Sequence, residues 1–536
     1  MKKTVLLIIL CVQLGFSQTQ DALVFLADKE NVAESIANPI SILTQEAIDR
    51  KQLHNTAIDA RDVPVNENYI AQINTNGITV YAKSKWMNSV YVRGSQSEIE
   101  DLLNLPFVTE VEFADSNLNR PSEDFFPKNK FAQETSSRII YNYGEAANQV
   151  EMLNVDYLHE NDFTGEGMIV AVMDSGFPNV MNNPAFSHII DENRLLGTYD
   201  FVLRQTDATG TGTHGAQTFS DIGGFLQDQF VGTAPNASFY LFRTEDGPNE
   251  NPVEEAWWVE ALERADSLGV DVVNTSLGYQ DFDNPNYDHL YEDLDGMTTI
   301  AARGANIAFE KGLLLVTSAG NDGNSFMFVA TPADAPGVLT VGAVNGAGEY
   351  ASFSSIGPTF DGRVKPDVMA KGRDAAVVYI DGTVITSNGT SFSSPIMAGA
   401  VTSLWQAVPS LTNGEIMDVV RQSSTLFENP TDQMGYGIPD FEEALNEALL
   451  LKVQEEALQQ RFAVYPNPVT KNVNISFPKN IEKAQFVLYN VLGKKVLDTQ
   501  ITAMENKVDL SLYPSGIYIA TVITDDNKSS FKLIKQ

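Results

Sequence analysis

Apolar and polar positions follow two different periods along the chain. From Gly144 to Leu450, short runs of aliphatic and β-branched residues alternate with longer stretches in which apolar residues recur every three to four positions. This succession is typical of an α/β fold, a parallel sheet with helices on both faces. The pattern predicts strands at 169–173, 238–242, 270–274, 313–317 and 338–341, and helices at 253–268, 301–311 and 391–407.

Two smaller segments flank this region. Residues 21–116 contain strand-like runs and a helical stretch that ends at Pro106, which predicts a small α+β unit. After a helical connector at 450–460, four short alternating runs between Phe462 and Gln536 predict a small β-sandwich. By pattern alone this sandwich fits a carbohydrate-binding or adhesion module, although it contains no tryptophan.

The chain begins with a predicted secretory signal peptide, residues 1–17. Two lysines precede a short apolar run, Val5 to Leu14, which polar residues follow. This run is too short to span a bilayer, and no other stretch approaches it in length, so no transmembrane segment is predicted. The single cysteine, Cys11, lies inside this leader, so the mature chain has no disulfide and no thiolate metal site.

Charge is distributed unevenly along the chain. The sequence has 70 acidic and 35 basic residues, a net charge of −35. Residues 145–450 hold 44 of the acidic and 11 of the basic residues, whereas 462–536 hold 6 and 9. A surface as acidic as that of the central region argues against nucleic acid and anionic lipid as partners.

Candidate chemistry centres on Ser391, in the stretch GTSFSSP at the start of a predicted helix. Free N–H groups at a helix start can stabilise an oxyanion while a serine hydroxyl attacks a carbonyl. The simpler interpretation is an N-capping serine. A nucleophilic serine needs a base and a carboxylate that orients it. His214, in the glycine-rich GTGTHG, and Asp174, at the end of a predicted buried strand, supply both.

Two further motifs, SAGN at 318–321 and FSSIGPTFDGRVKPDV at 353–368, complete a resemblance to the subtilases, the subtilisin-like serine peptidases. The resemblance covers about Gly144 to Leu450, and the order Asp, His, Ser is that of subtilisin. It implies Asp174, His214 and Ser391 as the catalytic triad and Asn321 as an oxyanion donor. It also implies two backbone edges that bind an extended substrate: Ser276, Leu277 and Gly278, and Ser318, Ala319 and Gly320.

The chain departs from the subtilase pattern in two places. Ala216 stands where threonine is usual, and Lys371 stands where proline is usual. Many subtilases bind calcium, but the acidic loop 281–296 matches no calcium-binding loop, and a solvated loop is the preferred interpretation. No metal site and no cofactor are therefore predicted.

The flanking segments also resemble known modules. Residues 18–137 resemble a subtilase prosegment followed by a processing linker, and the predicted peptidase domain is 144–450. The motifs YPNP, LYNVLGKKV and LYPSGIYIATV within 462–536 resemble the carboxy-terminal sorting domains of the type IX secretion system. This resemblance implies export across an outer membrane, to the medium or the cell surface, through contact with the secretion machinery.

The sequence thus predicts a secreted serine endopeptidase that is made as an inhibited precursor and hydrolyses polypeptides through an acyl-enzyme. A second hypothesis is a catalytically silent subtilase-like protein that binds a surface partner. A third is an adhesin whose sandwich domain binds glycans.

Overall fold

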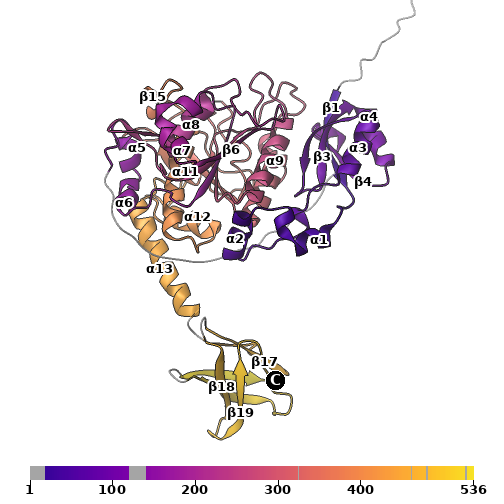
Figure 1. The fold of residues 1–536 in the computed structure, drawn as a ribbon, viewed down its shortest axis with the longest axis vertical. Coiled ribbons are helices and arrows are strands. Elements are labelled where there is room, and N and C mark those ends of the chain that lie inside the picture. The colour runs from indigo at the N-terminus through magenta and orange to yellow at the C-terminus, as the bar shows by residue number, and fades with distance from the viewer. Residues whose placement is uncertain (1–18, 120–140, 324, 460–461, 479–480, 525–527) are drawn as a thin grey trace, which may run out of the picture. The chain divides into compact units, whose positions relative to one another are not determined.

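The computed structural model describes residues 19–119, 141–323, 325–459, 462–478, 481–524 and 528–536. The predicted signal peptide, residues 1–17, and most of the processing linker lie outside these residues. The described residues form two compact units, 19–119 with 141–448, and 449–536 (Figure 1). The predicted domain limits stay predictions. None of the described helices is both long and apolar enough to cross a membrane.

The first unit is built around a seven-stranded parallel sheet. Its strand order is β13-β12-β11-β10-β5-β9-β6. The strands are β5 (Ile169–Asp174), β6 (Leu195–Asp200), β9 (Ser238–Arg243), β10 (Val272–Thr275), β11 (Leu314–Ser318), β12 (Val338–Val344) and β13 (Val368–Lys371). The α/β fold is therefore confirmed. Each predicted strand begins within two residues of the first residue of an observed strand.

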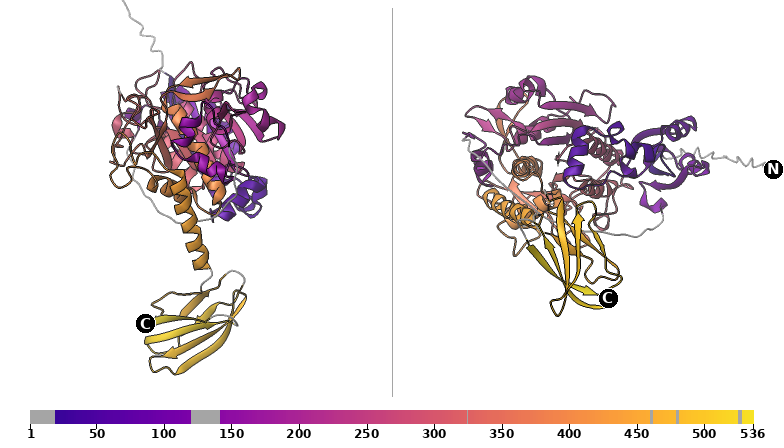
Figure 2. Two further views of the ribbon diagram at one scale, coloured as in Figure 1. Left: turned by 90° about the vertical axis from the view of Figure 1, so that its left-hand side faces the viewer. Right: turned by 60° about the horizontal axis from the view of Figure 1, so that its bottom comes forward.

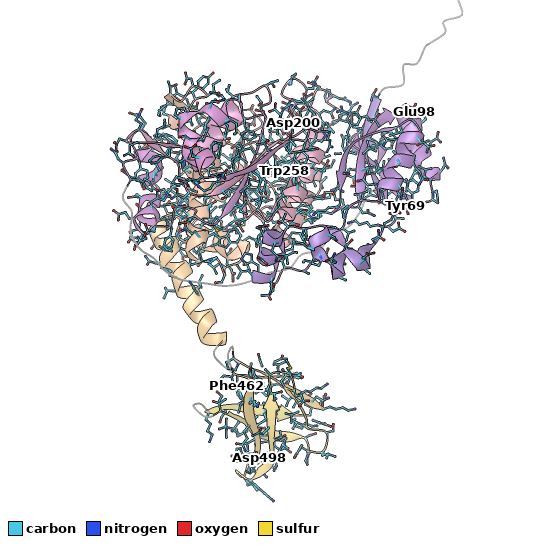
Figure 3. All side chains as sticks on the ribbon, in the orientation of Figure 1. Tyr69, Glu98, Asp200, Trp258, Phe462 and Asp498 are labelled. Atoms are coloured by element: carbon cyan, nitrogen blue, oxygen red, sulfur yellow. The ribbon has the colours of Figure 1, made fainter. Side chains whose placement is uncertain are left out.

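Helices cover the sheet because its strands are apolar on both faces. Helices α9 (Val253–Ser267) and α10 (Ile300–Glu310) pack with alternate strand residues such as Met173 and Leu315. Helix α11 (Thr390–Ala407) lies against strands β10 to β13. Trp258 of α9, labelled in Figure 3, is fully buried in this core.

The predicted prosegment forms an antiparallel sheet in the order β2-β3-β1-β4. Its strands are β1 (Thr19–Leu26), β2 (Thr79–Ser84), β3 (Ser89–Ser95) and β4 (Val108–Phe113). On one face, residues such as Val24 and Val90 pack into the prosegment's own core, near α3 (Glu67–Thr75) and α4 (Gln96–Asp101). On the other, Leu23 and Tyr91 join the core formed with α9 and α10.

A second part of the prosegment, residues 27–66, connects β1 to α3, and we call it the prosegment arm. It contains α1 (Val32–Ala37), the short 3-10 helix η1 (Pro39–Ser41), α2 (Gln45–Leu53) and the 3-10 helix η2 (Ala60–Asp62). Figure 1 shows α1 and α2 apart from the four-stranded sheet. The hydrophobic pattern did not predict this arm.

The second unit is a β-sandwich that follows α13 (Phe441–Gln459). One sheet has the order β16-β17-β20, and the other has the order β19-β18-β21-β22. Figure 2 shows the strands of this unit in yellow. The strands are β16 (Ala463–Tyr465), β17 (Asn472–Ser476), β18 (Lys483–Asn490), β19 (Lys495–Thr502), β20 (Lys507–Asp509), β21 (Gly516–Ile523) and β22 (Lys528–Lys535). Phe486 and Leu533 lie in its separate hydrophobic core, which confirms the predicted β-rich C-terminal domain.

Candidate active site

The parallel sheet brings the predicted site residues to one edge. Asp174 is the last residue of β5, and Asn321 lies three residues beyond the end of β11. The carboxyl ends of parallel strands share an edge, where α/β proteins bind their ligands. His214 begins α8 (His214–Gly223), and Ser391 lies in the first turn of α11.

Asp174 and His214 form a close hydrogen-bonded pair. Nδ1 of the imidazole lies 2.9 Å from Oδ1 and 3.0 Å from Oδ2 of the carboxylate. Because Nδ1 donates its proton to the carboxylate, Nε2 is the basic nitrogen of the neutral ring. Burial lowers the pKa of His214, but the charge and hydrogen bond of Asp174 outweigh burial and raise that pKa above 6.5.

Local backbone geometry explains why glycine follows His214. A Cβ atom at Gly215 would lie 2.5 Å from the carbonyl oxygen of Gly176 and 2.8 Å from Cβ of Asp174. Any larger residue there would separate α8 from the end of β5. Gly215 therefore allows the imidazole and the carboxylate to meet.

The buried carboxylate of Asp174 also accepts hydrogen bonds from outside the predicted site. The backbone N–H of Ser175 donates to Oδ1 at 2.7 Å, and the Ser175 hydroxyl donates to the same oxygen at 3.1 Å. The Thr218 hydroxyl, one turn beyond His214 on α8, lies 3.2 Å from Oδ2 and 3.1 Å from the Gly215 carbonyl. Such donors stabilise a charged carboxylate in a buried position.

The start of α11 lies beside the imidazole, and the Ser391 hydroxyl is hydrogen-bonded elsewhere. The ring of Phe392, the next residue, is 5.7 Å from the His214 ring. Within the described part of the chain, the Ser391 hydroxyl donates to the Ser276 carbonyl at 3.4 Å rather than to the imidazole. Catalytic hydrogen bonds are often formed only when substrate is bound.

A buried polar network fixes the backbone of Ser391. Its carbonyl has no helical partner, since Pro395 lacks an N–H. The Ser276 hydroxyl donates to this carbonyl at 2.8 Å, and Nδ2 of Asn274 donates to the same hydroxyl at 3.2 Å. The Ser394 hydroxyl then donates to Oδ1 of Asn274 at 2.9 Å. Strand β10 and helix α11 are thus joined directly below the candidate nucleophile.

The side-chain amide of Asn321 is oriented by the residue before Ser391. Oδ1 of Asn321 accepts a hydrogen bond from the backbone N–H of Thr390 at 2.9 Å, and the Thr390 hydroxyl lies 3.2 Å from the same oxygen. Because Oδ1 is the amide atom held by Thr390, Nδ2 is the atom left to donate to another group. Asn321 is exposed, and its amide nitrogen is available to a ligand in the crevice.

The two predicted substrate-binding edges follow neighbouring strands of the sheet. Residues 276–278 follow β10, and 318–320 include the end of β11. Gly278 is exposed, Leu277 and Gly320 are half-buried, and Ser276, Ser318 and Ala319 are buried. Strands β10 and β11 are neighbours in the sheet, and the substrate-binding role of the two edges stays a prediction.

The acidic loop 281–296 uses its carboxylates to hold its own backbone. Asp288 accepts from the N–H of Phe282, Asp293 from that of Leu290, and Asp295 from that of Met297. Among the described residues, no group of three or more His, Cys, Asp or Glu side chains is arranged to hold a metal ion.

Comparison with protein-family models adds an independent finding. The model described as "Subtilase family" matches residues 165–438, which is more than half of the chain. The chain belongs to the subtilase family. Within this subtilase, residues 21–132 match "Peptidase S8 propeptide domain, Bacteroidota", and residues 463–536 match "Secretion system C-terminal sorting domain".

Individual relatives agree with this assignment. The subtilase is 27% identical to subtilisin NAT of Bacillus subtilis subsp. natto over 363 residues, which cover 67% of this chain and 81% of the relative. It is 30% identical to serine protease AprX of Bacillus subtilis (strain 168) over 290 residues, which cover 49% and 62%. Among solved structures, MycP3 protease from the type VII (ESX-3) secretion system is 20% identical, with a TM-score of 0.45, over 59% of this chain and 92% of that one.

These findings confirm the predicted class of protein. It is a secreted, subtilisin-like serine endopeptidase that is made as a precursor. Its sorting domain indicates export across the outer membrane, to the cell surface or beyond.

Sequence reasoning missed the residues that support the site. Thr218, Thr390 and Ser394 had no predicted role, whereas Asn274 was expected at the carboxyl end of its strand, beside the other site residues, but without its hydrogen bonds. Thr218 follows His214 by four residues, the spacing that places two side chains on the same face of a helix.

Proposed function

We propose that this subtilase hydrolyses peptide bonds through a triad of Ser391, His214 and Asp174, and that its prosegment holds the precursor inactive. The observation that carries the proposal is the hydrogen-bonded pair of His214 and buried Asp174 beside the N-terminus of α11. The pair supplies an oriented base, and the start of the helix supplies a hydroxyl and N–H groups.

The first step would form an acyl-enzyme. Nε2 of His214 accepts the proton of the Ser391 hydroxyl as Oγ attacks the substrate carbonyl carbon. For this, the hydroxyl must exchange its long bond to the Ser276 carbonyl for one to Nε2. Asp174 holds the imidazole and stabilises the imidazolium that forms. The amide nitrogen of Asn321 and the N–H of Ser391 would donate to the oxyanion.

The second half of the reaction reverses these roles. The imidazolium gives its proton to the leaving amine, and the peptide bond breaks. Water then enters, and His214 removes a proton from it while the oxygen attacks the acyl carbon. The Ser391 ester bond breaks, Oγ takes back a proton, and the carboxylic acid product leaves. The edges at 276–278 and 318–320 would hold the substrate backbone extended throughout.

Covalent labelling tests the nucleophile directly. We expect an uncharged aryl phosphonofluoridate to phosphonylate Ser391 and release fluoride, because only an activated serine attacks phosphorus quickly. Peptide mass spectrometry of the processed protein would locate the label, and Ser393, two residues further on, serves as an internal control. A label on another residue, or on none, would refute the assignment of Ser391.

Thr218 gives a prediction about the pH dependence of hydrolysis. We expect Thr218→Val to raise the pKa of His214, because Asp174 loses a donor and attracts the imidazolium proton more strongly. Since only the neutral imidazole acts as the base, the acidic limb of kcat/KM should move up, by roughly 0.5 pH unit. The limb is measured with an uncharged peptide amide.

Thr218→Ser is the matched variant. It keeps the hydroxyl, so the acidic limb of its kcat/KM profile should stay where it is in the wild type. Two other titratable groups lie near this pair: Glu245, which is buried and has a raised pKa, and Arg243, which is in register with Asp174 and donates to the Ser175 carbonyl. Neither is changed by the substitution. If the hydroxyl served only the Gly215 carbonyl, Thr218→Val would leave the limb where it is, and the proposed positioning role would be wrong.

The C-terminal unit would carry the contact with the secretion machinery. Support comes from its separate core and its excess of basic residues, which contrast with the acidic peptidase region. The substrates would be polypeptides that reach the exterior of the cell.

A further inference from the structure

The prosegment arm docks at the edge of the sheet opposite to the active site. It contacts residues that precede β10 and β11, such as Ser267 and Lys311, whereas the crevice lies beyond the carboxyl ends of these strands. His54 of the arm stacks on Trp405, 14 residues beyond Ser391 on α11. At 1.5 Å per helical residue this is about 20 Å from the nucleophile.

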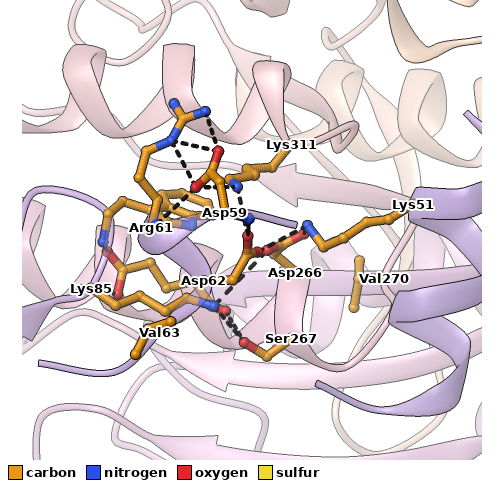
Figure 4. A network of polar contacts seen from close by, with 12 residues as sticks. Lys51, Asp59, Arg61, Asp62, Val63, Lys85, Asp266, Ser267, Val270 and Lys311 are labelled. Atoms are coloured by element: carbon orange, nitrogen blue, oxygen red, sulfur yellow. Dashed lines mark hydrogen bonds and ion pairs between the residues drawn. The ribbon is translucent and has the colours of Figure 1, made fainter. Parts of the chain in front are cut away.

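A buried chain of alternating charges joins the arm to the peptidase (Figure 4). From the arm, Arg50 and Lys51 reach Oδ1 of Asp266 at 2.5 and 2.7 Å. Asp62, also of the arm, pairs with Lys51 at 3.3 Å and with Lys311 of the peptidase at 2.7 Å. Lys51, Asp62, Asp266 and Lys311 are each at most 1% exposed.

Asp266 depends on the prosegment for all its described ion pairs. Its three cationic partners are Arg50, Lys51 and Lys85. Lys85 belongs to the turn between β2 and β3, and its Nζ lies 3.9 Å from Oδ2 of Asp266. Moreover, Asp266 lies in the last turn of α9, where the helix dipole disfavours a negative charge. The peptidase therefore holds a buried carboxylate that weakens its own helix and is neutralised only by the prosegment.

The backbone around Asp266 is also shaped to receive the arm. Gly269, with a φ of +82°, lies so close to α2 that a Cβ atom there would be 2.7 Å from the backbone nitrogen of Ala47. The N–H of Thr44 donates to the Ser267 carbonyl at 3.0 Å, and Arg50 donates to the carbonyl of Val270. The first turn of α2 and its last turn both contact the segment between α9 and β10.

We propose that the C-terminal ends of α9 and α10 form a docking site, separate from the active-site crevice, for a helix that presents two adjacent cations in its last turn, with helix α2 of the prosegment arm as its ligand. The site holds the prosegment on the peptidase after the linker has been cut. This regulatory role rests on the proposed precursor mechanism, but the docking itself requires no catalysis.

The test uses the full chain with Ser391→Ala, in which part of residues 120–140 is replaced by the recognition sequence of a foreign site-specific protease. After the foreign protease cuts the chain, we expect the prosegment to co-elute with the peptidase in gel filtration. Lys51→Met should weaken its binding about 100-fold, because the substitution breaks a buried ion network. The dissociation constant is measured on the cut complex, from the fraction of prosegment that stays with the peptidase as the complex is diluted.

Lys83→Met is the matched control, since Lys83 pairs with Glu67 inside the prosegment and both side chains are exposed. Its prosegment should have a dissociation constant within about threefold of that of the parent. If Lys51→Met also bound within threefold of the parent, the proposal would be overturned. Because every protein here carries Ser391→Ala, the outcome does not depend on whether Ser391 is the nucleophile.

A second pair of variants covers the case in which Lys51→Met does not fold, as judged by thermal unfolding of the uncut chain. Arg61 of the arm pairs with Glu310 of α10 at 2.6 Å on the rim of the site. Arg61→Met and Glu310→Gln should each weaken binding about two- to fivefold, and the double variant no more than either alone. If the two losses of affinity multiplied in the double variant, Arg61 and Glu310 would act independently, and the arm would not contact α10 through this pair.

Discussion

Ser391→Ala is expected to abolish hydrolysis of casein and to leave the precursor uncut. Without the hydroxyl, no acyl-enzyme can form, and the oxyanion donors and substrate edges alone give little rate enhancement. For serine peptidases, the loss of the nucleophile lowers kcat by about 10⁴- to 10⁶-fold. The release of soluble peptides from casein measures the loss of hydrolysis. The length of the secreted chain on a denaturing gel shows whether the precursor is cut.

Ser393→Ala supplies the control for this substitution. It removes a buried hydroxyl of the same size from the same turn of α11, one that donates only to the Thr390 carbonyl at 3.0 Å. Its activity should stay within about threefold of wild type. Turnover near wild type in Ser391→Ala would refute the nucleophile. An inactive but fully processed Ser391→Ala protein would show that another protease cuts the linker.

The position of the site followed from the sequence because parallel strands impose it. A buried strand that ends in Asp174 and another followed by SAGN must bring their ends to one edge, whichever helices connect them. The segment after Ser391 was readable as a helix from its apolar run, 396–408, although Pro395 lies inside α11 and leaves the Ser391 carbonyl without a helical partner. The edge strands β6 and β13 were missed, since Leu195–Asp200 is only half-buried and Val368–Lys371 has just four residues.

The prosegment arm could not be read from the sequence for a physical reason. Arg50 and Lys51 have the composition of a solvated helix face, and the nearer partner of the buried Lys51, Asp266, lies more than 200 residues away in the chain. The pattern of a single helix contains no information about such a distant partner. Likewise, Asp266 reads as an ordinary polar residue near a helix end until its three cationic partners are known.

The oxyanion role of Asn321 is separable from its role in holding Thr390. Oδ1 of Asn321 accepts from the Thr390 N–H at 2.9 Å, and the amide nitrogen is the group that would face the oxyanion. Asn321→Asp keeps an acceptor for Thr390 but replaces the donor by a negative oxygen. Asn321→Leu removes both groups at nearly constant volume. The two variants therefore differ in whether the start of α11 keeps its anchor, and in the negative charge that only Asp places near the oxyanion.

Both variants are expected to lower kcat by about 100- to 1,000-fold, the range known for one such donor in a subtilisin, with KM nearly unchanged. KM should hold because the donor acts on charge that develops only in the transition state. Steady-state kinetics on a peptide amide measure the two constants separately. Activity near wild type in Asn321→Asp, together with a large loss in Asn321→Leu, would show that Asn321 acts only by anchoring Thr390. A rise in KM at constant kcat would instead assign Asn321 to ground-state binding of the substrate.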